Sequence, residues 1–466
     1  MKEKEFFMGI YCPPAVPTDK YPSRITQDVY SRLKEVGVKH IYGYYEDEKG
    51  EQYVEQSLDL CAANAMYFYP RLNTFNHYLG MYGHKKYPHY SELSEERKTE
   101  MDAEFIRWMQ KIKNHPGCGG ICISDECPYE VYDGMGVASK LFAEHCGGKE
   151  LHYNALNYFG NNQTMFYRVM EPVEKDIRLE GDLEYNAENR FNRYKVYLDK
   201  YLDTCVTNHL STDLYPFALT WKDVPTSIHR GLYETSTIFA SYRKERGITC
   251  YHCIQVGDWD LTTRYIGRPE TALHMNISAA YQLDGYIFFP GMFPNDWLDD
   301  NMMNQGAHGV TGLLDCTGKP TIHYAYVQRL NEHLQACAST LLGADWLGVC
   351  TTGEFAGGFC DVNFEEIEWS ECIYKGGLPE NETHAYTGSL PEIKTSSQLF
   401  IGVFGNETED IYWFTNNSIV TDVNFEVKVF GEWSLTMDGK TVHGTGNVKV
   451  SELNAGESAL LKVKRD

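Results

Sequence analysis

Short apolar runs alternate with amphipathic stretches along most of the chain, from about residue 5 to about residue 335. Near-continuous apolar runs are typical of parallel strands that helices cover, while apolar residues spaced three or four apart predict the helices themselves. The predicted strands are residues 6–11, 40–45, 65–69, 119–126, 151–157, 210–217, 249–255 and 285–289. Eight strands alternating with helices predict a closed (β/α)₈ barrel of the α/β class.

The helical stretches carry their own boundary signals. The predicted helix at 94–114 has acids in its first turn and Lys111 and Lys113 in its last, which matches the helix dipole. A long stripe from Phe191 to Cys205 has apolar residues at spacings of three and four. A last helix is expected to open at Pro320 and to close at Gly343.

From about residue 345 the helical periodicity gives way to short alternating runs separated by turn residues. The clearest runs are 399–404, 411–414, 425–429 and 459–463. Such runs predict an antiparallel β-sandwich of about 100 residues. The chain of 466 residues is long enough for both units. We therefore predict a catalytic barrel over 1–343 and an all-β sandwich over 344–466.

The net charge of −23 disfavours nucleic acids and anionic membranes as partners, because such a surface repels phosphate. A neutral small molecule or oligosaccharide is the expected substrate, and a homo-oligomer stays possible. The N-terminus has no apolar stretch of signal-peptide length, and no run of about 18 apolar residues follows it. These features predict a cytoplasmic protein.

The 14 cysteines are mostly scattered singly within apolar patterns, as buried free thiols are. Cys250 and Cys253 lie three residues apart in a predicted strand, where alternation sends their thiols to opposite faces. The histidines of the 73–90 loop do not fall at metal-ligand spacings on one helix. We expect neither a catalytic metal nor a cofactor.

The C-terminal ends of barrel strands face the catalytic mouth, so the residues there are the candidates for chemistry. They are acids, amides and aromatic residues, with no phosphate-binding glycine loop: Glu46, Asn73, Asp125, Glu126, Asn154, Asn157, Asp213, Tyr215, Gln255, Asp258, Trp259 and Trp297. Aromatic residues make up 14% of the chain and suit stacking on sugar rings. Tyr215, Trp259 and Trp297 are the candidates for such a platform, and a place in the core is the alternative for each.

Glycosidic cleavage needs one carboxylic acid to protonate the leaving oxygen and a second carboxylate across the bond. Glu126 suits the acid, because it follows a buried strand and lies beside Asp125, so burial and like charge raise a pKa there. The alternative is that the pair caps the next helix. Asp213, at the end of the sixth strand, is the candidate nucleophile or base; a buried acid bonded to barrel amides is its alternative. Asp258 and, for an inverting reaction, Glu46 are further candidates.

The segment from Gly119 to Pro128 resembles the fourth strand of uncharacterised barrel glycosidases related to the retaining β-glycosidase clan, which often read Gly-Tyr-x-x-x-Asp-Glu-Pro there. The resemblance continues through residues 151–157, 197–202, 211–217 and 315–321, and so covers roughly residues 5–340. It implies a carbohydrate-active barrel, often accompanied by a β-domain.

Two positions depart from that family. Its well-studied members have Asn before the strand-four Glu, to hold the sugar 2-hydroxyl, where this chain has Asp125. They place a nucleophilic Glu at the end of strand seven, where this chain has Gln255, which cannot act as a nucleophile. A barrel that binds carbohydrate without cleaving it, or a lyase or isomerase acting on a sugar, therefore stays open beside the glycosidase.

Overall fold

The computed structural model describes residues 4–44, 47–71, 78, 88, 90–127, 129–156, 187–217, 228, 231–257, 266–293, 312–352 and 382–465. Eight parallel strands form its first sheet: β1 (Phe7–Tyr11), β2 (His40–Tyr44), β3 (Tyr67–Arg71), β4 (Gly120–Asp125), β5 (Glu150–Ala155), β6 (His209–Leu214), β7 (Thr249–Gln255) and β8 (Gly285–Phe289). They are ordered β3-β2-β1-β8-β7-β6-β5-β4, so each strand lies beside its neighbour in sequence, and β8 returns to β1.

Backbone contacts between β3 and the start of β4 close this sheet into a barrel. The Phe68 N–H donates to the carbonyl of Gly117 at 2.8 Å, and the Gly119 N–H donates to the carbonyl of Phe68 at 3.1 Å. The predicted (β/α)₈ barrel is confirmed. The third strand begins two residues later than predicted, because Ala65 has a φ of 57° and belongs to the preceding turn.

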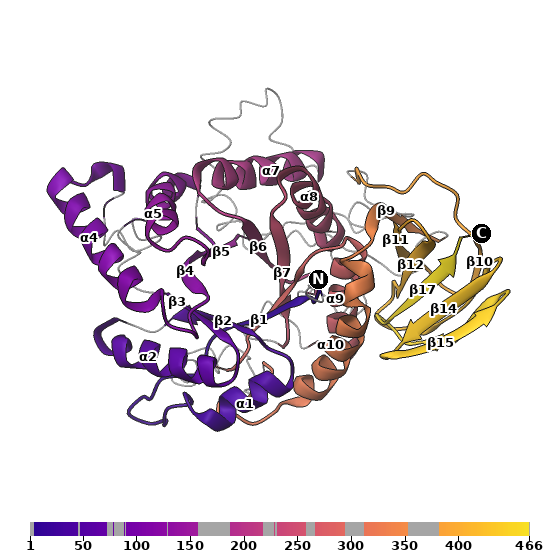
Figure 1. The fold of residues 1–466 in the computed structure, drawn as a ribbon, viewed down its shortest axis with the longest axis horizontal. Coiled ribbons are helices and arrows are strands. Elements are labelled where there is room, and N and C mark those ends of the chain that lie inside the picture. The colour runs from indigo at the N-terminus through magenta and orange to yellow at the C-terminus, as the bar shows by residue number, and fades with distance from the viewer. Residues whose placement is uncertain are drawn as a thin grey trace, which may run out of the picture.

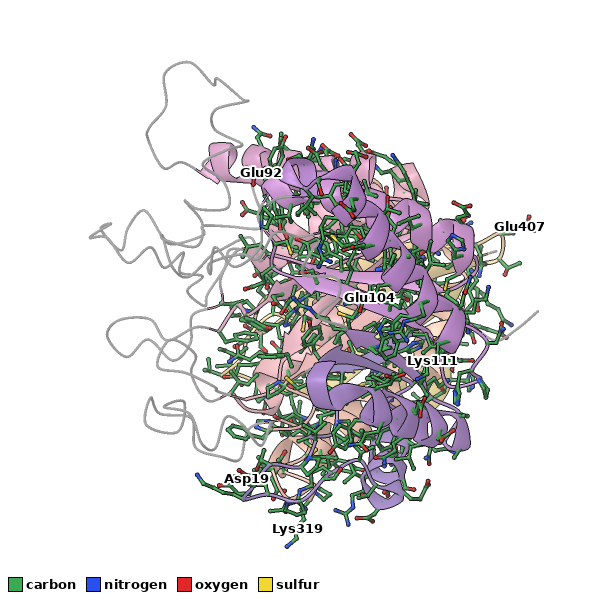
Figure 2. The ribbon with its side chains drawn as sticks, turned by 90° about the vertical axis from the view of Figure 1, so that its left-hand side faces the viewer. Asp19, Glu92, Glu104, Lys111, Lys319 and Glu407 are labelled. Carbon is green, nitrogen blue, oxygen red and sulfur yellow. The ribbon has the colours of Figure 1, made fainter. Side chains whose placement is uncertain are left out.

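Helices surround the barrel strands (Figure 1). They are α1 (Gln27–Glu35), α2 (Asp47–Ala63), α4 (Glu95–Ile112), α5 (Tyr132–His145), α7 (Ala187–Thr204), α8 (Gly231–Arg246), α9 (Arg268–Ala280) and α10 (Ile322–Leu341), with short 3-10 turns at Tyr90–Glu92 and Tyr129–Val131. Helix α4 buries Phe105 and Met109 and turns Glu104 and Lys111 outward (Figure 2). Within the described part of the chain, no helix combines the length and apolarity that crossing a membrane requires.

After α10 the chain forms two antiparallel sheets. Their strands are β9 (Asp345–Thr351), β10 (Glu392–Thr395), β11 (Leu399–Gly405), β12 (Glu409–Asn416), β13 (Val423–Lys428), β14 (Glu432–Met437), β15 (Lys440–Thr445), β16 (Val448–Leu453) and β17 (Ser458–Lys464). One sheet is ordered β10-β13-β16 and the other β15-β14-β17-β12-β11-β9. Apolar side chains between them, including Leu399, Phe414 and Val427, form a core of their own, as a β-sandwich requires.

The larger sheet of the sandwich packs beside α9 and α10 of the barrel (Figure 1). Trp413 is fully buried there, and its Nε1–H donates to the Asn276 carbonyl at 3.0 Å. The Asn276 side chain in turn donates to the carbonyl of Gly456 at 2.8 Å. The two units therefore share one buried surface along α9.

Inside the barrel, β5 and β6 present polar side chains along their whole length. Alternation places Glu150, His152 and Asn154 on one face of β5. It likewise places His209, Ser211 and Asp213 on one face of the neighbouring β6. A polar column therefore runs through the barrel interior, with carboxyl groups at both ends.

Candidate active site

Glu126 directly follows β4, at the catalytic mouth, and it has a strained backbone. Its φ is 44°, a left-handed conformation that costs energy for any residue except glycine. The Glu126 N–H donates to the Asn154 carbonyl at 2.9 Å, so the pairing with β5 continues past the end of β4 and holds this conformation. The side chain stays partly accessible to solvent. Such strain is typical of functional positions.

Asn154 joins the ends of three strands at this mouth. Its Nδ2 donates to Asp213 Oδ1 at 2.6 Å and to Asp125 Oδ1 at 3.1 Å. Its Oδ1 accepts a hydrogen bond from the Ser211 hydroxyl at 3.0 Å, which fixes the orientation of the amide. Tyr215 adds a second donor to Asp213 Oδ1, at 2.8 Å. The structure thus brings together five polar residues that the sequence placed at strand ends: Asp125, Glu126, Asn154, Asp213 and Tyr215.

The carboxyl groups of this cluster differ in their affinity for protons. Burial raises the pKa of Glu126 well above its ordinary value, and the charges of Asp213 and Asp125 and a hydrogen bond with Asp213 raise it further. Burial also raises the pKa of Asp213, but hydrogen bonds from Tyr215 and Asn154 oppose that rise. The surroundings therefore favour the protonated form of Glu126 more than that of Asp213.

The pKa of Asp125 depends on burial and on two opposite charges, those of Asp213 and Arg71. Burial raises its pKa to about 7, and the Asp213 charge adds to the rise, while the Arg71 guanidinium opposes it. Arg71 ends β3 and so belongs to the same mouth. The sequence pattern did not predict Arg71, because the apolar run of the third strand ends at Tyr69. Reading that strand on through Pro70 would have placed a cation at its end.

The remaining predicted site residues fall into two groups. Gln255 ends β7 and is fully buried, with its Nε2 donating to the Gly257 carbonyl at 2.8 Å. Its position on β7 puts it on the same face as Cys253, which lies 3.9 Å from the Tyr215 hydroxyl. Six candidates lie outside the described residues: Glu46, Asn73, Asn157, Asp258, Trp259 and Trp297.

At the opposite end of the barrel interior lies one group of residues able to hold a metal ion. Among the residues that the structure describes, the ligand atoms of Glu150, His152 and His209 all lie within 4.8 Å of one another. This group is remote from Glu126. The expectation that the mouth works without a metal stays a prediction.

No protein-family model and no curated protein matches the sequence. Among solved structures, the chain is similar to the β-galactosidase from Bacillus circulans sp. alkalophilus, with 8% identity, a TM-score of 0.53 and 99% of each chain covered. It is also similar to Gan42B, a GH42 β-galactosidase, with 7% identity, a TM-score of 0.50, and 99% of this chain and 100% of that chain covered. This chain therefore shares over its full length the fold of solved β-galactosidases, a (β/α)₈ barrel followed by antiparallel β-sheets.

Proposed function

We propose that the protein is a glycoside hydrolase in which Glu126 protonates the leaving oxygen of a glycosidic bond. The observation that carries the proposal is the cluster of Glu126, Asp213 and Asp125 at the C-terminal mouth of the barrel, where burial and the neighbouring carboxyl groups raise the pKa of Glu126. A carboxyl group that stays protonated at neutral pH is what a general acid requires. The overall likeness to two β-galactosidases is compatible with this chemistry but does not identify the sugar.

The charges around Glu126 allow it to act first as a general acid and then as a general base. In the resting site the Asp213 carboxylate keeps the proton on Glu126. Once Glu126 has given that proton to the leaving group, two carboxylates lie side by side. Their repulsion favours the return of a proton to Glu126, which then acts as a general base toward the attacking water. The Asp213 carboxylate therefore favours the protonated form of Glu126 both before the leaving group departs and after it has departed.

Asp213 has two candidate roles. A hydrogen bond between the two carboxyl groups contributes to the raised pKa of Glu126, and such a bond requires a separation shorter than the about 5–5.5 Å that a retaining nucleophile keeps from its acid. That proximity favours Asp213 as the anion that tunes Glu126 and stabilises positive charge developing on the sugar ring. The nucleophile or base role is the second candidate, and variants of Asp213 separate the two.

Asp125, Asn154 and Arg71 are the proposed contacts for sugar hydroxyl groups. Asp125 occupies the position at which related glycosidases have Asn. A carboxylate there accepts hydrogen bonds from two hydroxyls, whereas an amide accepts and donates. The neighbouring Arg71 charge favours the ionised form of Asp125. Substrates with adjacent free hydroxyl groups are therefore expected to bind best.

The proposal is tested with a panel of nitrophenyl glycosides and unsubstituted disaccharides. Wild-type protein is compared with Glu126→Gln and with Glu104→Gln, a matched change on the outer face of α4 (Figure 2). We expect hydrolysis of at least one substrate, a loss of about 10²–10⁴-fold in Glu126→Gln, and no loss in Glu104→Gln. Equal turnover by wild type and Glu126→Gln would contradict the assignment. Sugar binding without any turnover would favour the non-catalytic barrel, and turnover without hydrolysis a lyase or isomerase.

A further inference from the structure

The N-terminal end of the barrel interior holds a carboxylate and two histidines that the proposed hydrolysis does not use. Glu150 opens β5, and His152 follows on the same face of that strand. His209 opens the adjacent strand β6. The His152 and His209 side chains are 0% and 2% exposed, while the Glu150 side chain keeps 19% of its surface exposed. The cluster is therefore closed on the histidine side and open to solvent past Glu150.

The spacing of the three side chains fits a metal ion. Glu150 Oε1 lies 3.2 Å from His152 Nδ1 and 3.6 Å from His209 Nε2. Ligand atoms that surround a tetrahedral zinc ion at about 2.0–2.1 Å lie roughly 3.3–3.4 Å from one another. The two imidazole rings are parallel within 1°. One carboxylate oxygen thus faces two imidazoles at the distances that a shared ion would set.

An unsatisfied nitrogen atom supplies a second, independent observation. Nε2 of His209, the atom that faces Glu150, is buried without a hydrogen-bond partner. The other nitrogen of His209, Nδ1, lies 3.4 Å from Asn208 Oδ1, to which an N–H can donate. That tautomer leaves a lone pair on Nε2 of His209, aimed at the Glu150 carboxylate. Two acceptors that face each other in a buried site repel unless a proton or a metal cation lies between them.

Two buried tyrosines orient the carboxylate. The Tyr251 hydroxyl donates to Glu150 Oε1 at 2.7 Å, and the Tyr42 hydroxyl donates to the same oxygen at 3.0 Å. Hydrogen bonds of this kind to a ligating carboxylate fix its position and are typical of protein metal sites. Because the tyrosines come from β2 and β7, the site is anchored across the barrel.

We propose that Glu150, His152 and His209 bind one divalent transition-metal ion, with zinc the best match to two imidazoles and a carboxylate. The ion joins the first residues of β5 and β6, at the barrel end that serves stability rather than catalysis. Asn154 of the catalytic mouth lies four residues farther along β5, about 13 Å away at the rise of a strand. The site is therefore structural, and it does not depend on the proposed hydrolysis.

The test uses the whole chain without a histidine tag, stripped with a chelator and then titrated with Co²⁺. We expect the visible absorption of tetrahedral cobalt to saturate at about one ion per chain and to vanish when Zn²⁺ is added. Zinc at about 100-fold excess over its Kd is expected to raise the Tm by about 5 °C. Absence of both the absorption and the Tm rise in wild-type protein would overturn the proposal without any variant.

Variants then locate the ion. His209→Gln and His152→Gln are expected to lose the cobalt absorption. His252→Gln is the matched control, because His252 is equally buried on β7 and also has an unpartnered Nε2. It should bind cobalt as wild type does. Each variant is first shown to be folded by circular dichroism. Full binding by a folded His209→Gln variant, or loss of binding in folded His252→Gln, would overturn the assignment to this cluster.

Discussion

Glu126 and Glu150 lie at opposite ends of one barrel interior, and their surroundings shift their pKa values in opposite directions. Burial raises the pKa of Glu126, and the negative charges of Asp213 and Asp125 add to that rise. Burial would also raise the pKa of Glu150, but its interactions with His209 and His152 and a hydrogen bond from Tyr251 outweigh it. The pKa of Glu150 is therefore below its ordinary value.

The difference comes from the neighbours, since the residue type is the same and burial alone would raise both pKa values. The mouth gathers three carboxyl groups, which compete for too few donors, so the pKa of each is raised. The opposite end gathers imidazoles and hydroxyls around one carboxylate, which stays an anion. A barrel interior thus provides a reactive acid at one end and a stable anion at the other.

The largest expected effect is on catalysis, and it separates the two glutamates. Glu126→Gln removes the transferable proton and is expected to lower kcat/KM by about 10²–10⁴-fold for glycosides with poor leaving groups. Glu150→Gln leaves the mouth intact and should keep kcat/KM close to wild type. Steady-state kinetics of both variants measure this. A comparable loss of kcat/KM in a folded Glu150→Gln protein would contradict the claim that only the Glu126 end of the barrel takes part in catalysis.

The Asp213→Asn variant tests whether Asp213 raises the pKa of Glu126 or acts as the nucleophile. With its neighbouring negative charge removed, Glu126 has a lower pKa, so the alkaline limb of the kcat/KM profile is expected to move to lower pH. Dinitrophenyl glycosides need no proton for departure, and on them the variant should lose much less activity than on unsubstituted sugars. If the variant stays inactive on dinitrophenyl glycosides and azide restores turnover, Asp213 is the nucleophile instead.

Stability should respond to the same two glutamates with opposite signs. Glu150→Gln weakens the hydrogen bonds that Tyr42 and Tyr251 donate, so we expect it to lower the free energy of unfolding by about 1–3 kcal/mol at neutral pH. Glu126→Gln relieves the crowding of carboxyl groups and is expected to raise that free energy. Chemical denaturation of the three proteins at pH 7 compares them. Equal free energies of unfolding for the three proteins would contradict the claim that the surroundings act in opposite directions on the two glutamates.

The pH dependence of these differences follows from the direction of each pKa shift. The raised pKa of Glu126 means that stability is lost as pH rises above the unfolded value of about 4.3, so the advantage of Glu126→Gln should grow with pH above it. The lowered pKa of Glu150 means that its stabilisation is present above about 4.3 and is lost as pH falls below it. Unfolding curves between about pH 2 and pH 8 test both signs. A Glu126→Gln advantage that shrinks as the pH rises would contradict the first.

The smallest expected effect concerns Tyr215. Tyr215→Phe removes one of the hydrogen bonds to the Asp213 carboxylate, each worth about 1–1.5 kcal/mol net. Turnover should fall by about tenfold, far less than in Glu126→Gln. Kinetics on one substrate rank the two variants. A loss as large as that of Glu126→Gln would make Tyr215 a reacting group rather than a positioning residue.

The barrel strands were predictable because buried parallel strands leave continuous apolar runs, and the predicted ends of all eight lie within three residues of the ends in the structure. Helices α8 and α9 left no such signal. Residues 231–242 of α8 and 270–280 of α9 are buried almost all round, between the strands and neighbouring parts of the fold. Without a solvent-exposed face, a helix has no amphipathic period to read.

The candidate site was predictable where strand ends were read correctly. Asp125, Glu126, Asn154, Asp213 and Tyr215 meet as the barrel rule requires. The Glu150 cluster was missed because the fifth and sixth strands were predicted to begin one residue late, which cut off Glu150 and His209. Alternating polar residues on two adjacent strands were the available signal. The contacts across strands that set each pKa depend on register, which a single sequence does not supply.

The protonation states of the two glutamates are the most direct test of the account. Carbon-13 labelling of glutamate carboxyl groups, with Glu126→Gln and Glu150→Gln used to assign the two resonances, allows both to be followed from acidic to alkaline pH. We predict a Glu126 carboxyl that is still protonated at pH 7 and a Glu150 carboxyl that stays ionised below pH 4. Titration of both groups near the ordinary value of about 4.3 would contradict the claim that their pKa values are shifted in opposite directions.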